Sequence, residues 1–223
     1  LGEGGFLYLL GQGAIVTIRI AVFSMLLAVI IGLPIAILRL YGPWYARLFA
    51  IIYVEFFRGI PVLFLLYVLY YGMPEVGSVV TWFLGKEWKP YEPEFIAILA
   101  FGLNYGAYEA EIYRAGLSAV PVGQWEAGAA LGMSKTLTFR RIILPQAIRG
   151  ILPPMTNDFV ALFKDTSLVS AISLVELSKQ FQILSKPAAQ YFEIGLATAI
   201  LYLMMSVPLG WLARHLEKKW AKT

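Results

Sequence analysis

The sequence of 223 residues contains no cysteine and only one histidine, His215. Without cysteine the chain has no disulfide, no thiol nucleophile and no cysteine-ligated metal. It contains no GxxxxGK[ST] motif, so it has no phosphate-binding loop for ATP. A Ser-His-Asp triad is also not expected, because His215 lies in a basic tail. These absences predict that the chain is not an enzyme and holds no metal or cofactor of its own.

Charge is also scarce. Charged residues make up 14% of the chain, against about a quarter in soluble domains, whereas hydrophobic residues make up 59%. The mean hydropathy is +0.71. Several apolar stretches reach the roughly 18 to 25 residues that cross a bilayer as a helix. We therefore predict an all-α integral membrane protein with one domain, residues 1–223. Its five transmembrane helices are expected at residues 15–38, 48–71, 95–116, 148–168 and 191–213.

Basic residues predict the orientation of these spans, because loops rich in lysine and arginine face the cytoplasm. Arg39 and Arg47 lie between spans one and two. Further groups lie between spans three and four and after span five: Lys135, Arg140, Arg141, Arg149, Arg214, Lys218, Lys219 and Lys222. All three groups fall on one side if the N-terminus is outside and the C-terminus is cytoplasmic. This placement accounts for a pI of 9.2 without a nucleic-acid partner.

A polar insert, EAGAALGMSKTLTFRRIILP, runs from Glu126 to Pro145 between spans three and four. Good helix formers come first, and Gly132 is a natural helix stop. Ser134 is placed to cap a second helix over residues 136–143, which Pro145 is expected to end. The insert is thus expected to be two short helices on the cytoplasmic side. On composition alone, a solvated connecting loop is an equally good interpretation.

The spacing in this insert resembles the signature loop of binding-protein-dependent ABC importer permeases. That pattern is Glu-Ala-Ala, three residues, Gly, nine residues, Ile, one residue, Leu-Pro, and here only the second alanine differs, being Gly128. EFFRGIP (residues 55–61), NYGAYEAEIYRAG (104–116) and LFKDTSLVSAI (162–172) look like segments of the polar amino acid subfamily, of histidine, arginine and glutamine type. The resemblance covers nearly the whole chain.

The resemblance implies a type I ABC importer permease fold in the bacterial inner membrane. It also implies a second permease chain, identical or not, two cytoplasmic ATPases that hold ATP and magnesium, and an external substrate-binding protein. The loop at residues 118–147 would couple the permease to the ATPases, and its small residues would allow close docking. The coupling residues implied or assigned are Glu126, Ala127, Gly128, Ala130, Gly132 and Arg140.

Polar residues at similar depth in spans two, three and four predict a substrate cavity, since an ionisable group facing lipid costs about 3 kcal/mol. Gly59 and Pro61 should weaken span two and free backbone groups for a ligand. An amino acid needs a cation for its carboxylate and a carboxylate for its ammonium group. The expected substrate-binding residues are Arg58, Glu55, Asn104, Tyr108, Asn157 and Asp158, with Tyr105 as an alternative to Tyr108. Whether the cargo is basic stays open.

Structural roles are the alternatives for these groups. Glu55 and Arg58 have the spacing of an ion pair within one helix, and Asp158 has Lys164 as a possible partner. Three more ionisable residues, Glu109, Glu111 and Arg114, are expected to brace the insert with Arg140 or Arg141 as partners. Near the outer end of span one, Arg19 is expected to extend to the membrane surface.

Two other functions remain as alternatives. A self-contained secondary amino acid carrier, driven by an ion gradient, would need no ATPase. Five spans are few for such a carrier, and no inverted repeat is visible. An intramembrane enzyme or scaffold would leave the spacing of the insert unexplained. The permease interpretation is therefore preferred.

Overall fold

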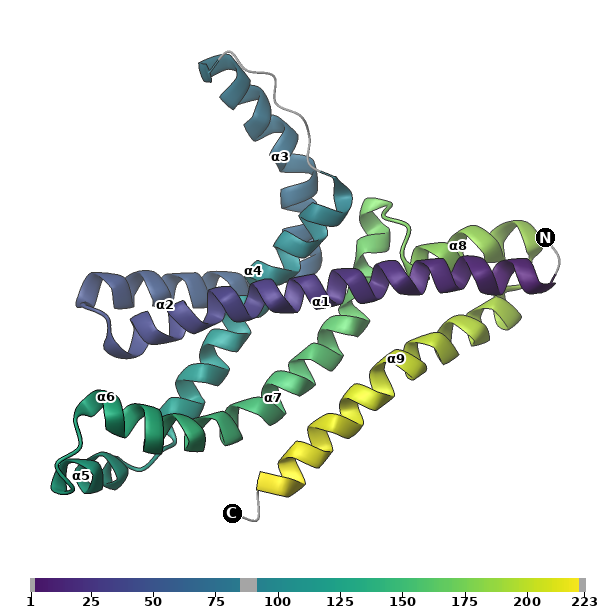
Figure 1. Ribbon diagram of the computed structural model, residues 1–223. Coiled ribbons are helices and arrows are strands. Elements are labelled where there is room, and N and C mark those ends of the chain that lie inside the picture. Colours follow the sequence, from purple (N-terminus) through teal and green to yellow (C-terminus); the bar gives the residue numbers. More distant parts are fainter. Residues whose placement is uncertain (1–2, 85–91, 221–223) are drawn as a thin grey trace.

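The computed structural model describes residues 3–84 and 92–220, and every regular element within these ranges is helical (Figure 1). The elements are α1 (Glu3–Tyr41), α2 (Trp44–Gly59), α3 (Val62–Leu84), α4 (Pro93–Ser118), α5 (Val122–Ala130), α6 (Lys135–Thr138), η1 (Phe139–Ile143), α7 (Leu144–Asp165), η2 (Thr166–Ile172), α8 (Leu177–Ala188) and α9 (Tyr191–Trp220). The all-α class predicted from the sequence is confirmed for these residues.

Within residues 3–84 and 92–220, two helices are long and apolar enough to cross a membrane on their own. They span Gly5–Tyr41, with a hydropathy of 2.8, and Tyr191–His215, with a hydropathy of 1.7. The pair α2 and α3 makes a third if it is counted as one bent span. At 1.5 Å per residue, α4 and α7 reach about 39 and 33 Å, enough for a bilayer, but both carry several ionisable residues. The five-span count and the orientation therefore stay predictions.

The expected second span, residues 48–71, is wrong as a continuous helix. The axes of α2 and α3 differ by 99° at the break between them. Ile60 is extended, with φ −97° and ψ 126°, as expected for a residue before proline. Pro61 has no N–H to continue the helix, and Gly59 disfavours the helical state. As a result α3 projects away from α1 and α2 (Figure 1).

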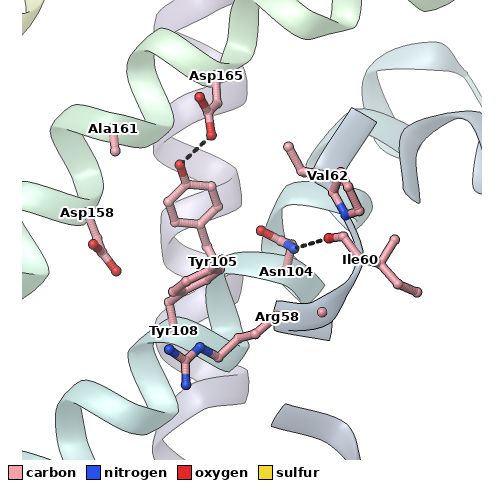
Figure 2. Close-up of a pocket in the computed structure, with 11 residues that line it drawn as sticks. Arg58, Ile60, Val62, Asn104, Tyr105, Tyr108, Asp158, Ala161 and Asp165 are labelled. Atoms are coloured by element: carbon pink, nitrogen blue, oxygen red, sulfur yellow. Dashed lines mark hydrogen bonds between the residues drawn. The ribbon is translucent and has the colours of Figure 1, made fainter. Parts of the chain in front are cut away.

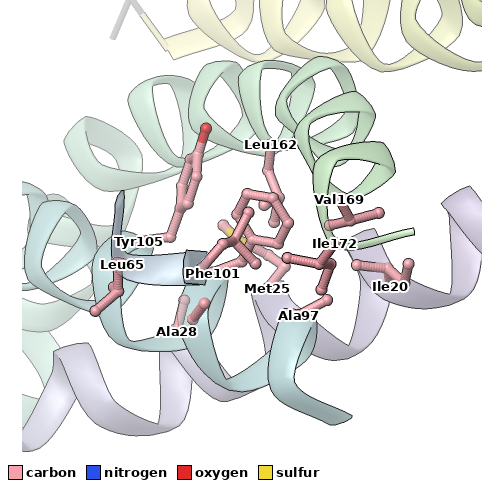
Figure 3. Packing of buried hydrophobic residues seen from close by; sticks show 12 residues of the cluster. Ile20, Met25, Ala28, Leu65, Ala97, Phe101, Tyr105, Leu162, Val169 and Ile172 are labelled. Atoms are coloured by element: carbon pink, nitrogen blue, oxygen red, sulfur yellow. The ribbon is translucent and has the colours of Figure 1, made fainter. Parts of the chain in front are cut away.

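The most extensive packing joins α1 to α4. A Cβ added to Gly32 of α1 would lie 2.8 Å from Glu109 Cβ and 2.9 Å from the Gly106 carbonyl oxygen of α4. The two backbones therefore approach closely at this point. Nearby, the main core cluster joins α1, α3, α4, α7 and η2, with the fully buried Phe101 at its centre (Figure 3). This core fixes α4 and α7 relative to the break between α2 and α3.

Ion pairs link α4 to α1 at two levels. Arg19 of α1 pairs with Glu94 near the start of α4, so it has a partner instead of extending alone to the membrane surface. Toward the other end, Arg39 of α1 pairs with Glu111, which also accepts a bond from Arg114. The prediction that Glu111 and Arg114 pair with Arg140 or Arg141 is therefore wrong. The close α1–α4 packing brings Arg39 within reach first.

A buried polar cluster ties α8 to α1 and α9. Glu176 is fully buried and caps α8, accepting from the backbone N–H groups of Ser178 and Lys179, both at 2.8 Å. The Tyr202 hydroxyl of α9 donates to the same carboxylate at 3.1 Å, and the Thr17 hydroxyl of α1 at 3.4 Å. Three segments distant in sequence therefore meet at one carboxylate.

The insert continues into α7 without interruption. The π-helical turn η1 links α6 to α7, and the Leu144 N–H donates to the Phe139 carbonyl. The prediction that Pro145 ends the second helix is wrong. Pro145 lies in the first turn of α7, where a missing N–H is tolerated, and the wider π turn accommodates it.

Figure 1 places the N-terminus and α8 at one end of α1, and the start of α2 at its other end. Leu40, near the end of α1, packs against a buried cluster that includes Ile143, and Trp125 and Phe139 of the insert pack against the same cluster. The helix α9 runs back from the α8 end beside α7 (Figure 1). This arrangement is compatible with the predicted grouping of basic segments on one side.

Candidate functional site

The break between α2 and α3 creates polar surface inside the helical bundle. Because the helix stops at Gly59, backbone carbonyls near the break lose their helical partners. Asn104 of α4 compensates, since its Nδ2 donates to the Phe57 carbonyl at 2.6 Å and lies 3.5 Å from the Ile60 carbonyl. Its amide oxygen points away from Ile60 (Figure 2). Asn104 therefore holds the broken helix in place and leaves one acceptor available.

A cavity of about 340 Å³ lies beside this break (Figure 2). That volume is at the lower end of the roughly 300 to 1,000 Å³ typical of small-molecule sites. Residues from α2, the break, α3, α4 and α7 line it: Arg58, Gly59, Ile60, Pro61, Val62, Asn104, Tyr105, Tyr108, Asp158, Ala161 and Asp165. We refer to this cavity as the polar pocket.

The polar pocket has one cationic side chain and two carboxylates. The Arg58 guanidinium lies 5.2 Å from the centroid of the Tyr108 ring, a cation–π distance. Asp158 and Asp165 are seven residues apart on α7, which puts them on the same face of that helix. With all three groups ionised, the lining carries a net charge of −1.

The two carboxylates differ in their partners. Asp165 accepts a hydrogen bond from the Tyr105 hydroxyl at 2.8 Å, shown as a dashed line in Figure 2. Asp158 makes no hydrogen bond or ion pair with any residue in the described ranges. A carboxylate without a partner in a partly desolvated site favours a positively charged ligand. Asp158 is therefore the group in the polar pocket that a positively charged ligand would stabilise most.

Four of the predicted substrate-binding residues meet in the polar pocket: Arg58, Asn104, Tyr108 and Asp158. The side chains of Glu55 and Asn157 are not among its lining, and their role in binding stays a prediction. The alternative ion pair between Glu55 and Arg58 does not form among the residues described here. Sequence reasoning missed Asp165, although its spacing of two turns from Asp158 could have indicated it.

The insert forms the predicted helix, turn and second helix. The first helix, α5, begins at Val122, ahead of the insert's first residue, Glu126. It ends at Ala130, and Gly132 then adopts a left-handed conformation with φ 73°, which favours glycine. The Ser134 side chain caps α6 by accepting from the Leu137 N–H at 3.3 Å. Stacking of Trp125 on Phe139, at 6.2 Å between ring centroids, joins the two halves. The insert is therefore a folded unit.

The proposed coupling residues divide into two groups. Five of them are exposed, as a docking surface requires: Glu126, Ala127, Ala130, Gly132 and Arg140. Gly128 is buried instead, and a Cβ added there would lie 2.5 Å from Thr138 Cγ2 and 2.6 Å from Thr138 Oγ1. The glycine that departs from the family pattern is therefore needed for α5 to pack on α6.

Comparison with known proteins identifies the family of this chain. The family described as binding-protein-dependent transport system inner membrane component matches residues 20–222. A Rickettsia bellii protein described as a glutamine transport system permease is 34% identical over 209 residues, 93% of this chain and 91% of that protein. The L-cystine transport system permease protein of Bacillus subtilis is 34% identical over 204 residues, 92% of this chain and 84% of that protein.

A solved structure shares the fold. The crystal structure of an amino acid ABC transporter with histidines contains a chain that is 31% identical, with a TM-score of 0.81. The match covers 95% of this chain and 94% of that one. The helical fold, the folded insert and the pocket between spans thus define an ABC transporter permease. This chain belongs to the family of binding-protein-dependent transport system inner membrane components, multi-pass proteins of the bacterial inner membrane.

Proposed function

We propose that this chain is the permease subunit of an ATP-driven importer of polar amino acids, with cationic amino acids as its preferred cargo. The observation that carries the proposal is the charge of the polar pocket, where Arg58 and two aspartates line one cavity of about 340 Å³. The relatives named for glutamine and cystine transport support an amino acid as the cargo. The second aspartate favours a cationic one.

Each charged group has a distinct role in this scheme. Arg58 binds the α-carboxylate of the cargo, since guanidinium and carboxylate match in geometry. Asp158, which has no partner in the described ranges, binds the α-ammonium group. Asp165, held by the Tyr105 hydroxyl at 2.8 Å, binds a cationic side chain. A neutral side chain would leave Asp165 with Tyr105 alone, so the pocket would hold glutamine less well than arginine.

Transport also needs partners. In this proposal two permease chains, each with five spans and its N-terminus outside, form the translocation path. Two ATPases with bound ATP and magnesium dock on the inserts, and an external binding protein delivers the cargo. The exposed Glu126, Ala127 and Ala130 of α5 form the docking surface, with Arg140 nearby. Closure of the ATPases moves α6, and α7 carries that movement to Asp158.

Uptake by the complete complex in liposomes tests the pocket assignment. We expect Asp158→Asn to lower uptake of arginine and glutamine alike, by about tenfold or more for a lost charged bond of 1.5–3 kcal/mol. Asp165→Asn should lower arginine uptake alone. Glu193→Gln, which removes an exposed carboxylate at the start of α9, is the matched control and should change neither.

Three results would overturn parts of the proposal. Equal arginine uptake by wild type and Asp158→Asn would remove the polar pocket from the transport path. A wild-type complex that prefers glutamine would refute the cationic preference alone. Flux through the purified chain without any ATPase, driven by a proton or sodium gradient, would instead establish a secondary carrier.

A further inference from the structure

Near the end of α9, one tryptophan and three basic residues lie close together on the helix. Arg214, His215 and Lys218 lie three, four and seven residues after Trp211, so the four residues form one stripe along the helix. They line a shallow hollow of about 270 Å³. All four are exposed, and Trp211 is 73% exposed. We refer to them as the basic stripe.

The basic stripe points away from the rest of the chain. Leu209 and Leu212 of α9 line an apolar groove together with residues of α1 and α7, and Ala213 is buried. At about 100° per residue, these inward positions lie on the opposite side of α9 from the stripe. The stripe is therefore available to whatever surrounds the helix.

An apolar column leads directly to the basic stripe. Exposed residues continue the same helix face toward the start of α9: Ile200, Leu203, Met204 and Val207. The apolar span ends at His215, so the stripe lies where the hydrocarbon core gives way to polar surroundings. This face of α9 is thus apolar along most of its length and cationic at its end. An anionic phospholipid has the matching parts, apolar acyl chains and a negatively charged headgroup.

Among the side chains that the structure describes, no carboxylate pairs with the basic stripe. No ion pair involves Arg214, His215 or Lys218 among these side chains. Arg214 Nη1 lies 3.5 Å from the position a Cβ would take at Gly210, one turn back toward the membrane. The guanidinium therefore lies back along α9, beside Gly210.

We propose that the basic stripe binds the headgroup phosphate of an anionic phospholipid, whose acyl chains lie along the apolar column. Arg214 would hold the phosphate through two N–H donors, with Lys218 and His215 as further donors. Trp211 would lie at headgroup level, where tryptophan is enriched in membrane proteins. Basic pockets at the cytoplasmic surface are known to select such headgroups. The apolar column favours a lipid over a soluble phosphate.

Quenching of Trp211 fluorescence by brominated lipid tests this proposal with the full chain in vesicles. The probes are brominated phosphatidylglycerol and brominated phosphatidylcholine at equal mole fraction, and the difference between wild type and Trp211→Phe isolates the Trp211 signal. We expect stronger quenching by phosphatidylglycerol. Arg214→Gln with Lys218→Gln should lower the local enrichment by about fivefold per cation removed.

Matched variants separate this site from general attraction of negative lipid. Arg141→Gln with Arg149→Gln removes the same charge from exposed positions elsewhere and should keep the phosphatidylglycerol excess. Arg214→Lys with Lys218→Arg preserves the charge and should keep most of the phosphatidylglycerol excess. A thermal unfolding midpoint near that of wild type confirms that each variant is folded.

Several outcomes would overturn the proposal. Equal quenching by the two lipids would show that the basic stripe does not select a headgroup. Loss of the excess on adding millimolar glycerol phosphate would identify a site for soluble anions. Trp211 shielded from both lipids would indicate a protein partner, such as a second copy of this chain, on this face. None of these results depends on the proposed cargo.

Discussion

Arg39 of α1 and Arg114 of α4 hold the same carboxylate, that of Glu111. Arg114 reaches it from one turn further along α4, at 2.9 Å, whereas Arg39 reaches it across the boundary between two helices. All three side chains are partly buried, with between 19% and 34% exposed. Glu111 is therefore the shared point of a three-residue network that joins α1 to α4.

This network predicts unequal effects of mutation. Glu111→Gln should lower the free energy of unfolding by about 1–3 kcal/mol, because it leaves two cations without their carboxylate. Arg39→Gln should cost less, since Arg114 still compensates the charge of Glu111. Arg114→Gln is the matched control, because it keeps the ion pair between Arg39 of α1 and Glu111 of α4. Thermal unfolding of the purified chain in detergent measures the stability of all three variants. A larger loss of stability for Arg39→Gln than for Glu111→Gln would contradict the network.

The fit of Gly128 against Thr138 predicts that the alanine of the family pattern is harmful here. Gly128→Ala would force the Thr138 side chain away and should destabilise the α5–α6 contact by about 1–3 kcal/mol. Limited trypsin digestion reports on this, because Lys135, Arg140 and Arg141 are cleavage sites within the insert. Cleavage should become about 5 to 150 times faster, because it follows the population of the opened insert.

A second substitution checks the cause. Thr138→Ala removes the two atoms that a new side chain would approach most closely, so Gly128→Ala with Thr138→Ala should recover most of the protection. Gly123→Ala on the same helix meets nothing within 4 Å and should leave cleavage unchanged. If the double variant is as sensitive as Gly128→Ala alone, Thr138 is not the reason.

Close approach of α1 and α4 makes Gly32 sensitive to substitution. Gly32→Ala should cost about 1–3 kcal/mol, because the added methyl group meets backbone atoms of α4 that cannot move away. Gly11→Ala is the matched control in the same helix, since nothing lies within 4 Å of the added atom, and it should be neutral or stabilising. Equal unfolding midpoints for the two variants would refute the argument from close packing.

Glu176 predicts a pH dependence of stability. Burial raises the pKa of Glu176 above its ordinary value of 4.5, although donors from Ser178, Lys179, Tyr202 and Thr17 lower it in part. The folded chain then holds this proton more tightly than the unfolded chain. The contribution of Glu176 to stability is therefore greatest below about pH 4.5 and falls as the pH rises through the raised pKa.

Comparison of variants isolates this contribution. Glu176→Gln cannot ionise, so its stability should fall less than that of wild type between pH 4.5 and 7. Glu193→Gln, at an exposed position, should keep the wild-type dependence. The measurement is the unfolding midpoint at several pH values in one detergent. Parallel curves for wild type and Glu176→Gln would show that the carboxyl group does not titrate in this range.

Local signals predicted local structure well. Gly132 and Ser134 mark the end of one short helix and the start of the next, and both act as expected because capping depends on neighbours in sequence. The break at Pro61 was also visible, since proline disrupts a helix wherever it lies in its interior. Four predicted pocket residues meet because polar groups in three spans lie at similar depth.

Long-range geometry was not predictable in the same way. Nothing in the sequence gives the 99° angle between α2 and α3, which depends on how each packs against α4. The choice of Arg39 as the partner of Glu111 follows from the α1–α4 approach, and sequence spacing carries no information on it. The prediction for Pro145 was wrong because proline can either end a helix or occupy its first turn. Here the π turn before it lets Pro145 lie in the first turn of α7.

The absence of a break between the insert and α7 has a mechanical consequence. From Lys135 to Asp165 the chain is helical over about 45 Å without an intervening loop, and its irregular points are the π turn η1 and the interior prolines Pro153 and Pro154. Because no loop separates them, we expect a displacement of α6 to pass along α7 toward the two aspartates of the polar pocket, with Pro153 and Pro154 as the points where the helix can bend. The same connection works in the opposite direction, and we expect a ligand bound by Asp158 and Asp165 to restrict the movement of the far end, where α5 and α6 pack.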